Sequence, residues 1–146
     1  MELSKEATFL SAVTPTAGVA GTSDINGSTL DMQNHEAVLM LVRMGAITGS
    51  AVTSIKAQQG DQSDASDMSD LLGTDVTIAD SDDDEVFGID LIKPEKRYVR
   101  LVVNRATQNA VVAGAEYIQT GARKQPIAQA AGITVETHVS PIEGTA

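Results

Sequence analysis

Residues 97–104 read RYVRLVVN, and they carry the clearest strand pattern in the 146-residue chain. Apolar side chains recur at every second position, at Val99, Leu101 and Val103. Successive side chains of a β-strand point to opposite faces, so this alternation predicts a strand that buries one face and exposes the other. We expect the outward face to carry Tyr98, Arg100, Val102 and Asn104.

Segments on either side of this strand also have β character. Residues 86–92 (VFGIDLI) alternate before it, and Pro94 prevents that strand from continuing into the following turn. Residues 110–119 (AVVAGAEYIQ) come after it, where Gly114 and the valines favour a strand over a helix. Residues 133–139 (ITVETHV) predict one more short strand.

The first half of the chain contains two more strand candidates. Residues 37–47 (AVLMLVRMGAI) are apolar at odd and even positions alike, which indicates a strand covered on both faces. The alternative, a short buried helix, is disfavoured by Gly45 and Gly49. Residues 50–58 (SAVTSIKAQ) alternate after a Thr-Gly-Ser turn at residues 48–50, so we expect the two segments to form a hairpin.

These short strands, together with a long irregular loop at residues 60–84, predict the fold class. We expect an all-β protein, an antiparallel β-sandwich or jelly-roll. The chain divides into an extended N-terminal arm at residues 1–30 and a β-sandwich domain at residues 31–146, with an acidic loop at residues 60–85.

Glycine and proline interrupt every pattern in the N-terminal arm, so a long helix or strand is not expected there. A segment that buries little in its own chain often becomes ordered on a partner, although a frayed terminus is the alternative. We expect the arm to contact a partner through its apolar residues Leu3, Phe9, Leu10 and Val13.

Charge is distributed unevenly along the chain. Asp and Glu number 20 against 10 Lys and Arg, which gives a formal net charge of −10. Ten of the acids fall in residues 61–85, which contain no basic residue, whereas residues 93–124 hold seven basic and two acidic residues. Such polarity suits assembly, so we expect the basic strand to meet an acidic partner surface and the acidic loop to face solvent. Ordinary solvated surface is the alternative.

Composition excludes several classes of function. Nucleic-acid binding needs more positive charge than this acidic chain offers, so we expect none. No apolar run approaches the roughly 18–20 residues that span a bilayer, and the N-terminal sequence lacks the pattern of a secretory signal, so we expect no membrane association. Without cysteine there is no disulfide scaffold and no thiolate metal site.

The motifs of catalysis and cofactor binding do not occur, and we expect no enzyme activity, cofactor or metal. The two histidines, His35 and His138, lie on different segments, and a pair of Glu136 with His138 falls short of the three or four ligands of a zinc site. Neither G-x-S-x-G nor a phosphate-binding loop is present. The Asp-rich residues 61–67 and 80–85 depart from the spacing of an EF-hand, and solvated loops are the favoured interpretation.

Residues 87–127 resemble the C-terminal half of a group of small structural proteins from tailed phages. Three parts carry the resemblance: a basic turn and RYVR strand at residues 96–103, a valine- and alanine-rich strand at residues 110–115, and a basic, proline-containing segment at residues 121–126. The earlier half agrees in outline, and the resemblance covers about residues 25–127.

The resemblance implies a capsid decoration, or cement, protein. Such a protein is made in the host cytoplasm, sits on the outer surface of the phage head, binds the major capsid protein and stabilises contacts between its copies. It is a small β-sandwich that self-associates as a dimer or trimer and has no catalytic residues. The basic strand would then contact its partner through Arg97, Tyr98, Arg100 and Arg105. Tyr98 and residues 38–44 are also candidates for a subunit interface, with simple core packing as the alternative.

Three other classes of function stay open. A different virion component, such as a head–tail connector, tail or head-fibre protein, would have a similar fold. A carbohydrate-binding β-module is weakened by the content of two Tyr, two Phe and no Trp, because sugars stack on aromatic rings. A small β-sandwich enzyme has the least support, since it would need His35 or His138 to converge on carboxylates.

Overall fold

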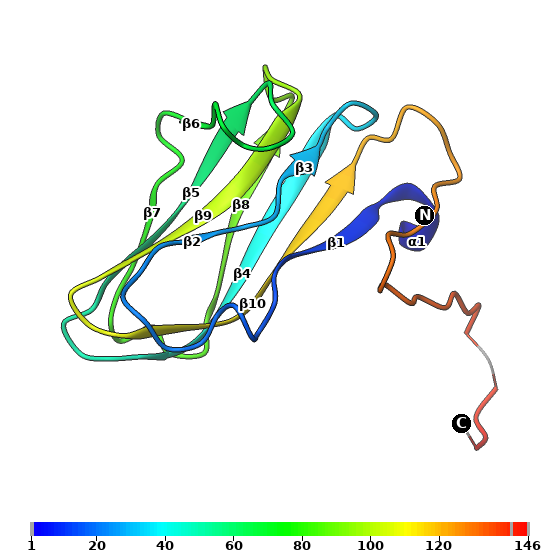
Figure 1. Ribbon diagram of the computed structural model, residues 1–146. Coiled ribbons are helices and arrows are strands. Elements are labelled where there is room, and N and C mark those ends of the chain that lie inside the picture. The colour runs from blue at the N-terminus through cyan, green and yellow to red at the C-terminus, as the bar shows by residue number, and fades with distance from the viewer. Residues whose placement is uncertain (1, 141, 146) are drawn as a thin grey trace.

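Two antiparallel β-sheets pack face to face and enclose the apolar core (Figure 1). The computed structural model describes residues 2–140 and 142–145. Sheet A has the strand order β1-β10-β4-β8; sheet B has the order β2-β9-β5-β6, with β3 beside β9 and β7 beside β5. The predicted all-β sandwich is confirmed.

Sheet A consists mainly of long strands, whereas sheet B combines two long strands with four short ones. Sheet A consists of β1 (Thr8–Val13), β4 (Ala37–Ile47), β8 (Val86–Ile92) and β10 (Ala110–Thr120). Sheet B consists of β2 (Ile25–Asn26), β3 (Leu30–Asp31), β5 (Val52–Gly60), β6 (Ser69–Asp70), β7 (Val76–Ile78) and β9 (Tyr98–Ala106). A short helix, α1 (Leu3–Glu6), precedes β1. Among the described residues, no helix is long and apolar enough to cross a membrane.

The strand predicted at residues 97–104 is β9, which lies within sheet B. Val99, Leu101 and Val103 are fully buried, as the alternation predicts. Val102, predicted to face outward, is also buried, because it lies between Asn26 and Lys56 of the neighbouring strands. The predictions for residues 86–92 and 110–119 match β8 and β10 closely.

The predicted hairpin of residues 37–47 and 50–58 is wrong. β4 pairs with β10 and β8 in sheet A, whereas β5 pairs with β9 in sheet B. The connection at residues 48–51 therefore crosses from one sheet to the other. Each strand places one row of apolar side chains in the core, such as Met40 on β4 and Ile55 on β5, so the two strands stack across the core instead of pairing.

The strand predicted at residues 133–139 is also wrong, since these residues form no strand. The C-terminal tail lies beside β1, where the side chain of Gln129 accepts the backbone N–H of Phe9 at 3.0 Å. The Gln129 amide also donates to the carbonyl oxygens of Ser4 and Ala7, at 2.8 Å each. A side chain thus occupies backbone groups that a further strand would need.

Residues 1–30, expected as an extended arm, contribute to both sheets wherever the structure describes them; Met1 lies outside the described residues. β1 pairs with β10 at the edge of sheet A, and Val13 joins the core. β2 and β3 flank β9, with Ile25 and Leu30 buried. In the single chain this segment is therefore part of the sandwich, and its contact with a partner stays a prediction.

Tyr117 links the two sheets through the core. It is fully buried on β10, and its hydroxyl accepts the backbone N–H of Leu101 at 2.9 Å and donates to the carbonyl of Ser28 at 2.9 Å. Gly27 leaves room for this hydroxyl, since a Cβ atom there would lie 2.7 Å from it. Burial raises the pKa of Tyr117 to about 12.

Candidate interaction surfaces

The outward face of sheet A is apolar. Phe9 of β1 lies opposite Ile118 of β10, which lies opposite Leu39 of β4, so three neighbouring strands carry one apolar row. These side chains neither belong to the core cluster nor pack against it. We define the apolar face by Phe9, Leu39, Leu41, Val86, Ile92 and Ile118. Its edge is well exposed, with Val86 at 48% and Ile92 at 66%.

Three charged side chains also lie on strands of this face. Arg43, Asp90 and Glu116 are exposed, and none forms a salt bridge within the described chain. Gly88 lies opposite Leu41, and a Cβ atom at Gly88 would come within 3.0 Å of the Leu41 side chain, so the glycine leaves space for that leucine. The apolar face is thus a packed surface with isolated, unpaired charges.

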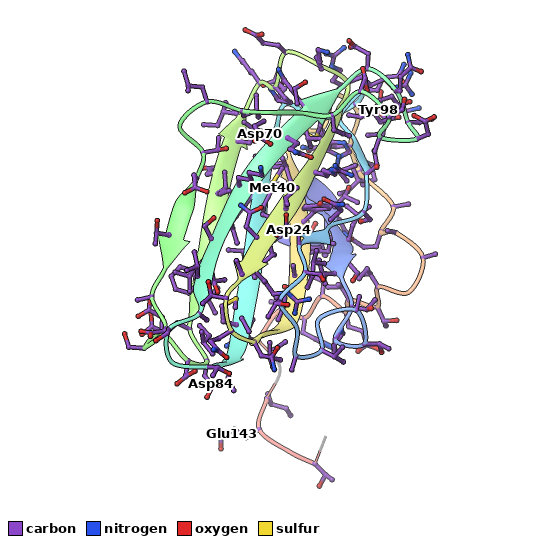
Figure 2. The ribbon with its side chains drawn as sticks, turned by 60° about the vertical axis from the view of Figure 1, so that its left-hand side comes forward. Asp24, Met40, Asp70, Asp84, Tyr98 and Glu143 are labelled. Carbon is purple, nitrogen blue, oxygen red and sulfur yellow. The ribbon has the colours of Figure 1, made fainter. Side chains whose placement is uncertain are left out.

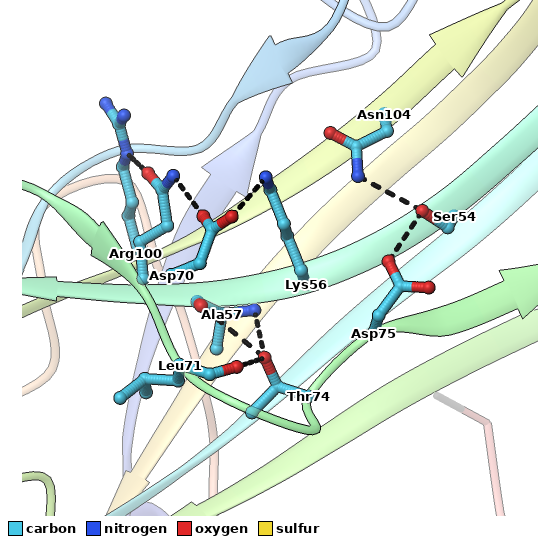
Figure 3. Close-up of polar contacts among 10 residues, drawn as sticks. Ser54, Lys56, Ala57, Asp70, Leu71, Thr74, Asp75, Arg100 and Asn104 are labelled. Atoms are coloured by element: carbon cyan, nitrogen blue, oxygen red, sulfur yellow. Dashed lines mark hydrogen bonds and ion pairs between the residues drawn. The ribbon is translucent and has the colours of Figure 1, made fainter.

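The outward face of sheet B has the opposite character (Figure 3). Asp70 accepts hydrogen bonds from Lys56 Nζ at 2.8 Å and Gln58 Nε2 at 2.6 Å, and Arg100 Nε donates to Gln58 Oε1 at 2.7 Å. A second chain runs from Asn104 through the Ser54 hydroxyl to a carboxylate oxygen of Asp75. The hydrogen bond from Lys56 holds the pKa of Asp70 below its usual range. The outward face of sheet B therefore carries a network of paired polar side chains and suits contact with water.

The four residues predicted for a basic partner surface do not all form one patch: Tyr98 and Arg100 lie two positions apart on the outward face of β9, whereas Arg105 is buried. Arg97 forms a bidentate salt bridge with Asp31, in which Nε and Nη2 donate to the two carboxylate oxygens at 3.0 and 2.7 Å. Its guanidinium carbon lies 5.1 Å from the centroid of the Tyr98 ring. Arg100 belongs to the network on sheet B. Arg105 is only 7% exposed.

Arg105 binds the backbone of its own chain. Its guanidinium donates to the carbonyl oxygens of Ser23, Val19 and Ala110 at 2.7 to 2.8 Å. Burial lowers the pKa of Arg105, but three carbonyl acceptors compensate the buried charge. This residue fixes the loop before β2 against the start of β10. Its position continues the inward row of Val99, Leu101 and Val103, a signal of burial that the interpretation as a basic strand did not use.

The four residues predicted for the arm are also dispersed. Leu3 lies on α1 and is 49% exposed, whereas Val13 is buried in the core. Leu10 is partly buried against the core. Phe9 is the member that lies on the apolar face, beside Ile118.

The acidic loop and the basic turn, expected at separate surfaces, meet in the structure. Lys96 Nζ lies 3.1 Å from an Asp61 carboxylate oxygen and 4.0 Å from one of Asp67. The acids of residues 80–85 lie at the other end of the sandwich, as Asp84 and Tyr98 show in Figure 2. The first half of the acidic loop thus neutralises part of the basic turn.

An open cleft of about 480 Å³ lies at the end of the sandwich that carries the basic turn. Its lining includes His35, Lys93 and Arg123, together with Glu36 and Glu95. Burial lowers the pKa of His35, whose Nε2 lies 3.3 Å from the Thr8 hydroxyl.

No group of three or more His, Asp or Glu side chains in the described part of the chain is arranged to hold a metal ion. At the tail, His138 Nε2 lies 3.2 Å from a carboxylate oxygen of Glu136.

These features define an antiparallel β-sandwich with one apolar and one polar outward face. No family model and no curated protein matches the sequence. The fold is similar to that in the crystal structure of the PBSX exported protein XepA, with a TM-score of 0.53 and 13% identity. The similarity covers 96% of this chain and 45% of that one, so this chain spans less than half the length of that protein. At this identity the likeness concerns the fold alone.

Proposed function

We propose that this chain is a phage structural protein, a capsid decoration subunit that binds the outer surface of the phage head. The observation that carries the proposal is the contrast between the apolar face of sheet A and the hydrogen-bonded polar face of sheet B. Monomeric proteins rarely leave a large contiguous apolar surface exposed, so such a surface marks an interface. The similarity in fold to a phage PBSX protein supports the phage assignment.

The apolar face would lie against the major capsid protein, and sheet B would face solvent. Burying Leu39, Leu41 and Ile118 removes apolar area from water, which favours association. A subunit that binds only the assembled shell stabilises that shell by mass action. Many copies on one lattice stay attached even when each contact is weak, because release of one copy leaves the others in place.

The proposed role is mechanical rather than catalytic. The stabilising action needs a rigid body with a binding face and a solvent face, and the sandwich supplies both. The net charge of −10 would make a decorated particle more acidic, which would oppose aggregation between particles.

The proposal is tested by binding purified protein to phage heads that lack it and imaging the particles by electron microscopy. We expect density over the whole head surface. Density at a single vertex would indicate a connector or tail protein, and no binding to any particle would contradict a virion role. That last outcome would favour a second candidate function, that of an exported protein, as the name of the PBSX exported protein XepA suggests.

A matched pair of variants locates the binding face. Leu39→Lys places a charge in the middle of the apolar face, and we expect the affinity for heads to fall at least about tenfold. Thr77→Lys adds the same charge at an exposed position of β7 in sheet B, and we expect unchanged affinity. Equal effects of the two variants would contradict the assignment of sheet A as the binding face.

A further inference from the structure

The free edge of β8 is a second unpartnered surface. β8 pairs with β4 on one side only. Hydrogen bonds from Lys93 N to Glu36 O at 2.7 Å and from Met44 N to Glu85 O at 2.9 Å bracket this ladder. Because hydrogen-bonded pairs alternate along an antiparallel ladder, odd-numbered residues of β8 direct their backbone groups toward β4. The outward N–H and C=O groups therefore belong to Val86, Gly88, Asp90 and Ile92.

These outward groups have no hydrogen-bond partner elsewhere in the described chain. The strand reads VFGIDLI, so it lacks proline and lysine, and Asp90 is its one charged residue. Proteins usually protect sheet edges with such residues, with short strands or with a covering segment.

The other sheet edges of this molecule are protected in those ways. β1 is covered where Gln129 binds the backbone of Phe9. At the edges of sheet B, β2, β3, β6 and β7 are two or three residues long. β8, with seven residues, is the long and uncovered edge among the described strands.

We propose that β8 pairs with β8 of a second copy of this chain, antiparallel about a two-fold axis at Ile89. The sequence around Ile89 is self-complementary: Val86 would face Ile92, Phe87 would face Leu91, and Ile89 would face itself. Cross-strand pairs of β-branched and aromatic residues stabilise antiparallel ladders. The pairing does not depend on the proposed capsid function.

The direction of the backbone groups and the charge of Asp90 favour a two-fold axis at Ile89 over an axis at Gly88 or Asp90. Two-fold pairing must join even-numbered residues to even-numbered residues, since those carry the outward groups. An axis at Asp90 would set two aspartates directly opposite each other, which is unfavourable. An axis at Gly88 would place Ile92 opposite Asp84, which lies outside the strand. With the axis at Ile89, all four outward residues are paired and Asp90 faces Gly88.

The paired copies would share one eight-stranded sheet with a continuous apolar face. A contact made by one strand from each copy is smaller than the roughly 800 Å² per partner of a stable interface, so we expect a weak dimer in solution. Binding of both copies to one surface would strengthen the attachment, because the second contact forms at high effective concentration.

Cross-linking through cysteine tests the register, since the chain has no cysteine of its own. In Ile89→Cys the two cysteines would form a non-hydrogen-bonded pair with Cα atoms about 4.5 Å apart, within the range of a disulfide. We expect mild oxidation to give a covalent dimer. Ala113→Cys, an exposed position on the interior strand β10, is the matched control and should stay monomeric.

A backbone variant tests the hydrogen bonds without relying on residue 89. Asp90→Pro removes an outward N–H that the single chain does not use, and edge strands tolerate proline there. Asp90→Ala removes the same carboxylate but keeps the N–H. We expect light scattering over a concentration series to show a dimer for the wild type and Asp90→Ala and a monomer for Asp90→Pro, with circular dichroism confirming that all three are folded.

Two results would overturn the proposal. One is a wild-type chain that remains monomeric at every concentration, with Ile89→Cys cross-linking no faster than Ala113→Cys. The other is a dimer that persists in folded Asp90→Pro. Failure of capsid binding in the earlier experiment would leave these measurements unaffected, so the two proposals fail separately.

Discussion

The Tyr117 hydroxyl takes the place of a strand in sheet B, because it accepts the backbone N–H of Leu101 at a gap in the ladder. β2 and β3 both pair with β9, but residues 27–29 between them are not part of either strand. A side chain from sheet A thus completes the hydrogen bonding of sheet B. This single group makes the two sheets depend on each other.

Tyr117→Phe should destabilise the fold by about 1–3 kcal/mol, because it leaves the buried Leu101 N–H without its acceptor. Equilibrium unfolding in urea measures the change. Tyr98→Phe is the control, since Tyr98 is partly exposed and its hydroxyl has no hydrogen bond within the described chain. Equal stability of the two variants would show that the Tyr117 hydroxyl contributes little.

Alkaline pH should destabilise the protein through the same residue. The pKa of Tyr117 is raised to about 12 from an ordinary value of 10.0, so the unfolded chain loses this proton at lower pH than the folded one. The contribution of the neutral Tyr117 hydroxyl to the free energy of unfolding is complete below pH 10. It is lost as the pH rises toward 12. Thermal unfolding between pH 9 and pH 12 should show a smaller decline in Tm for Tyr117→Phe than for the wild type (the interval follows from the cited pKa).

Arg105→Lys should lower the free energy of unfolding by about 3 kcal/mol, because an ammonium group cannot reproduce the hydrogen bonds of the planar guanidinium to three carbonyl oxygens. The loop at residues 14–24 should also become sensitive to protease. Arg100→Lys is the matched control on the polar face of sheet B, and we expect a change below about 1 kcal/mol there. A fully stable Arg105→Lys variant would mean that the loop holds its position without the guanidinium.

Gly18→Ala should displace the same loop from β10. A Cβ atom at residue 18 would collide with the carbonyl oxygen of Val112, whose N–H binds the Gly18 carbonyl at 2.8 Å. Overpacking of this kind costs about 1–3 kcal/mol. Gly49→Ala adds a methyl group in open space and should leave Tm nearly unchanged. Nuclear magnetic resonance would report the loop displacement as shifts at Val112 and its neighbours.

Local alternation predicted the strands well but did not predict which strands pair. Residues 86–92 alternate and form β8 as predicted, because side-chain alternation is a property of each strand alone. The pairing of β4 depends on β8 and β10, which are distant in sequence, so the short connection to β5 suggested the wrong neighbour. The alternation of β9 places Arg105 in its inward row, but the loop that accepts its hydrogen bonds lies some 80 residues earlier in the chain, and no strand pattern encodes that partner.

The apolar pattern of residues 37–47 predicts a strand covered on both faces, and the chain itself covers only one. Val38, Met40 and Val42 are buried in the core, whereas Leu39 and Leu41 lie on the apolar face. The second apolar row of this strand is therefore the sequence signal of the apolar face. It could not be distinguished from core packing before the position of sheet B was known.

The late position of β10 in the chain has a consequence for how the protein folds during synthesis. β10 lies between β1 and β4, so the two earlier strands of sheet A cannot be joined until the ribosome has made residue 120. Contacts between such distant segments slow folding, because a long loop must close before each contact forms. During synthesis β1 and β4 therefore lack their common partner strand until β10 has been made.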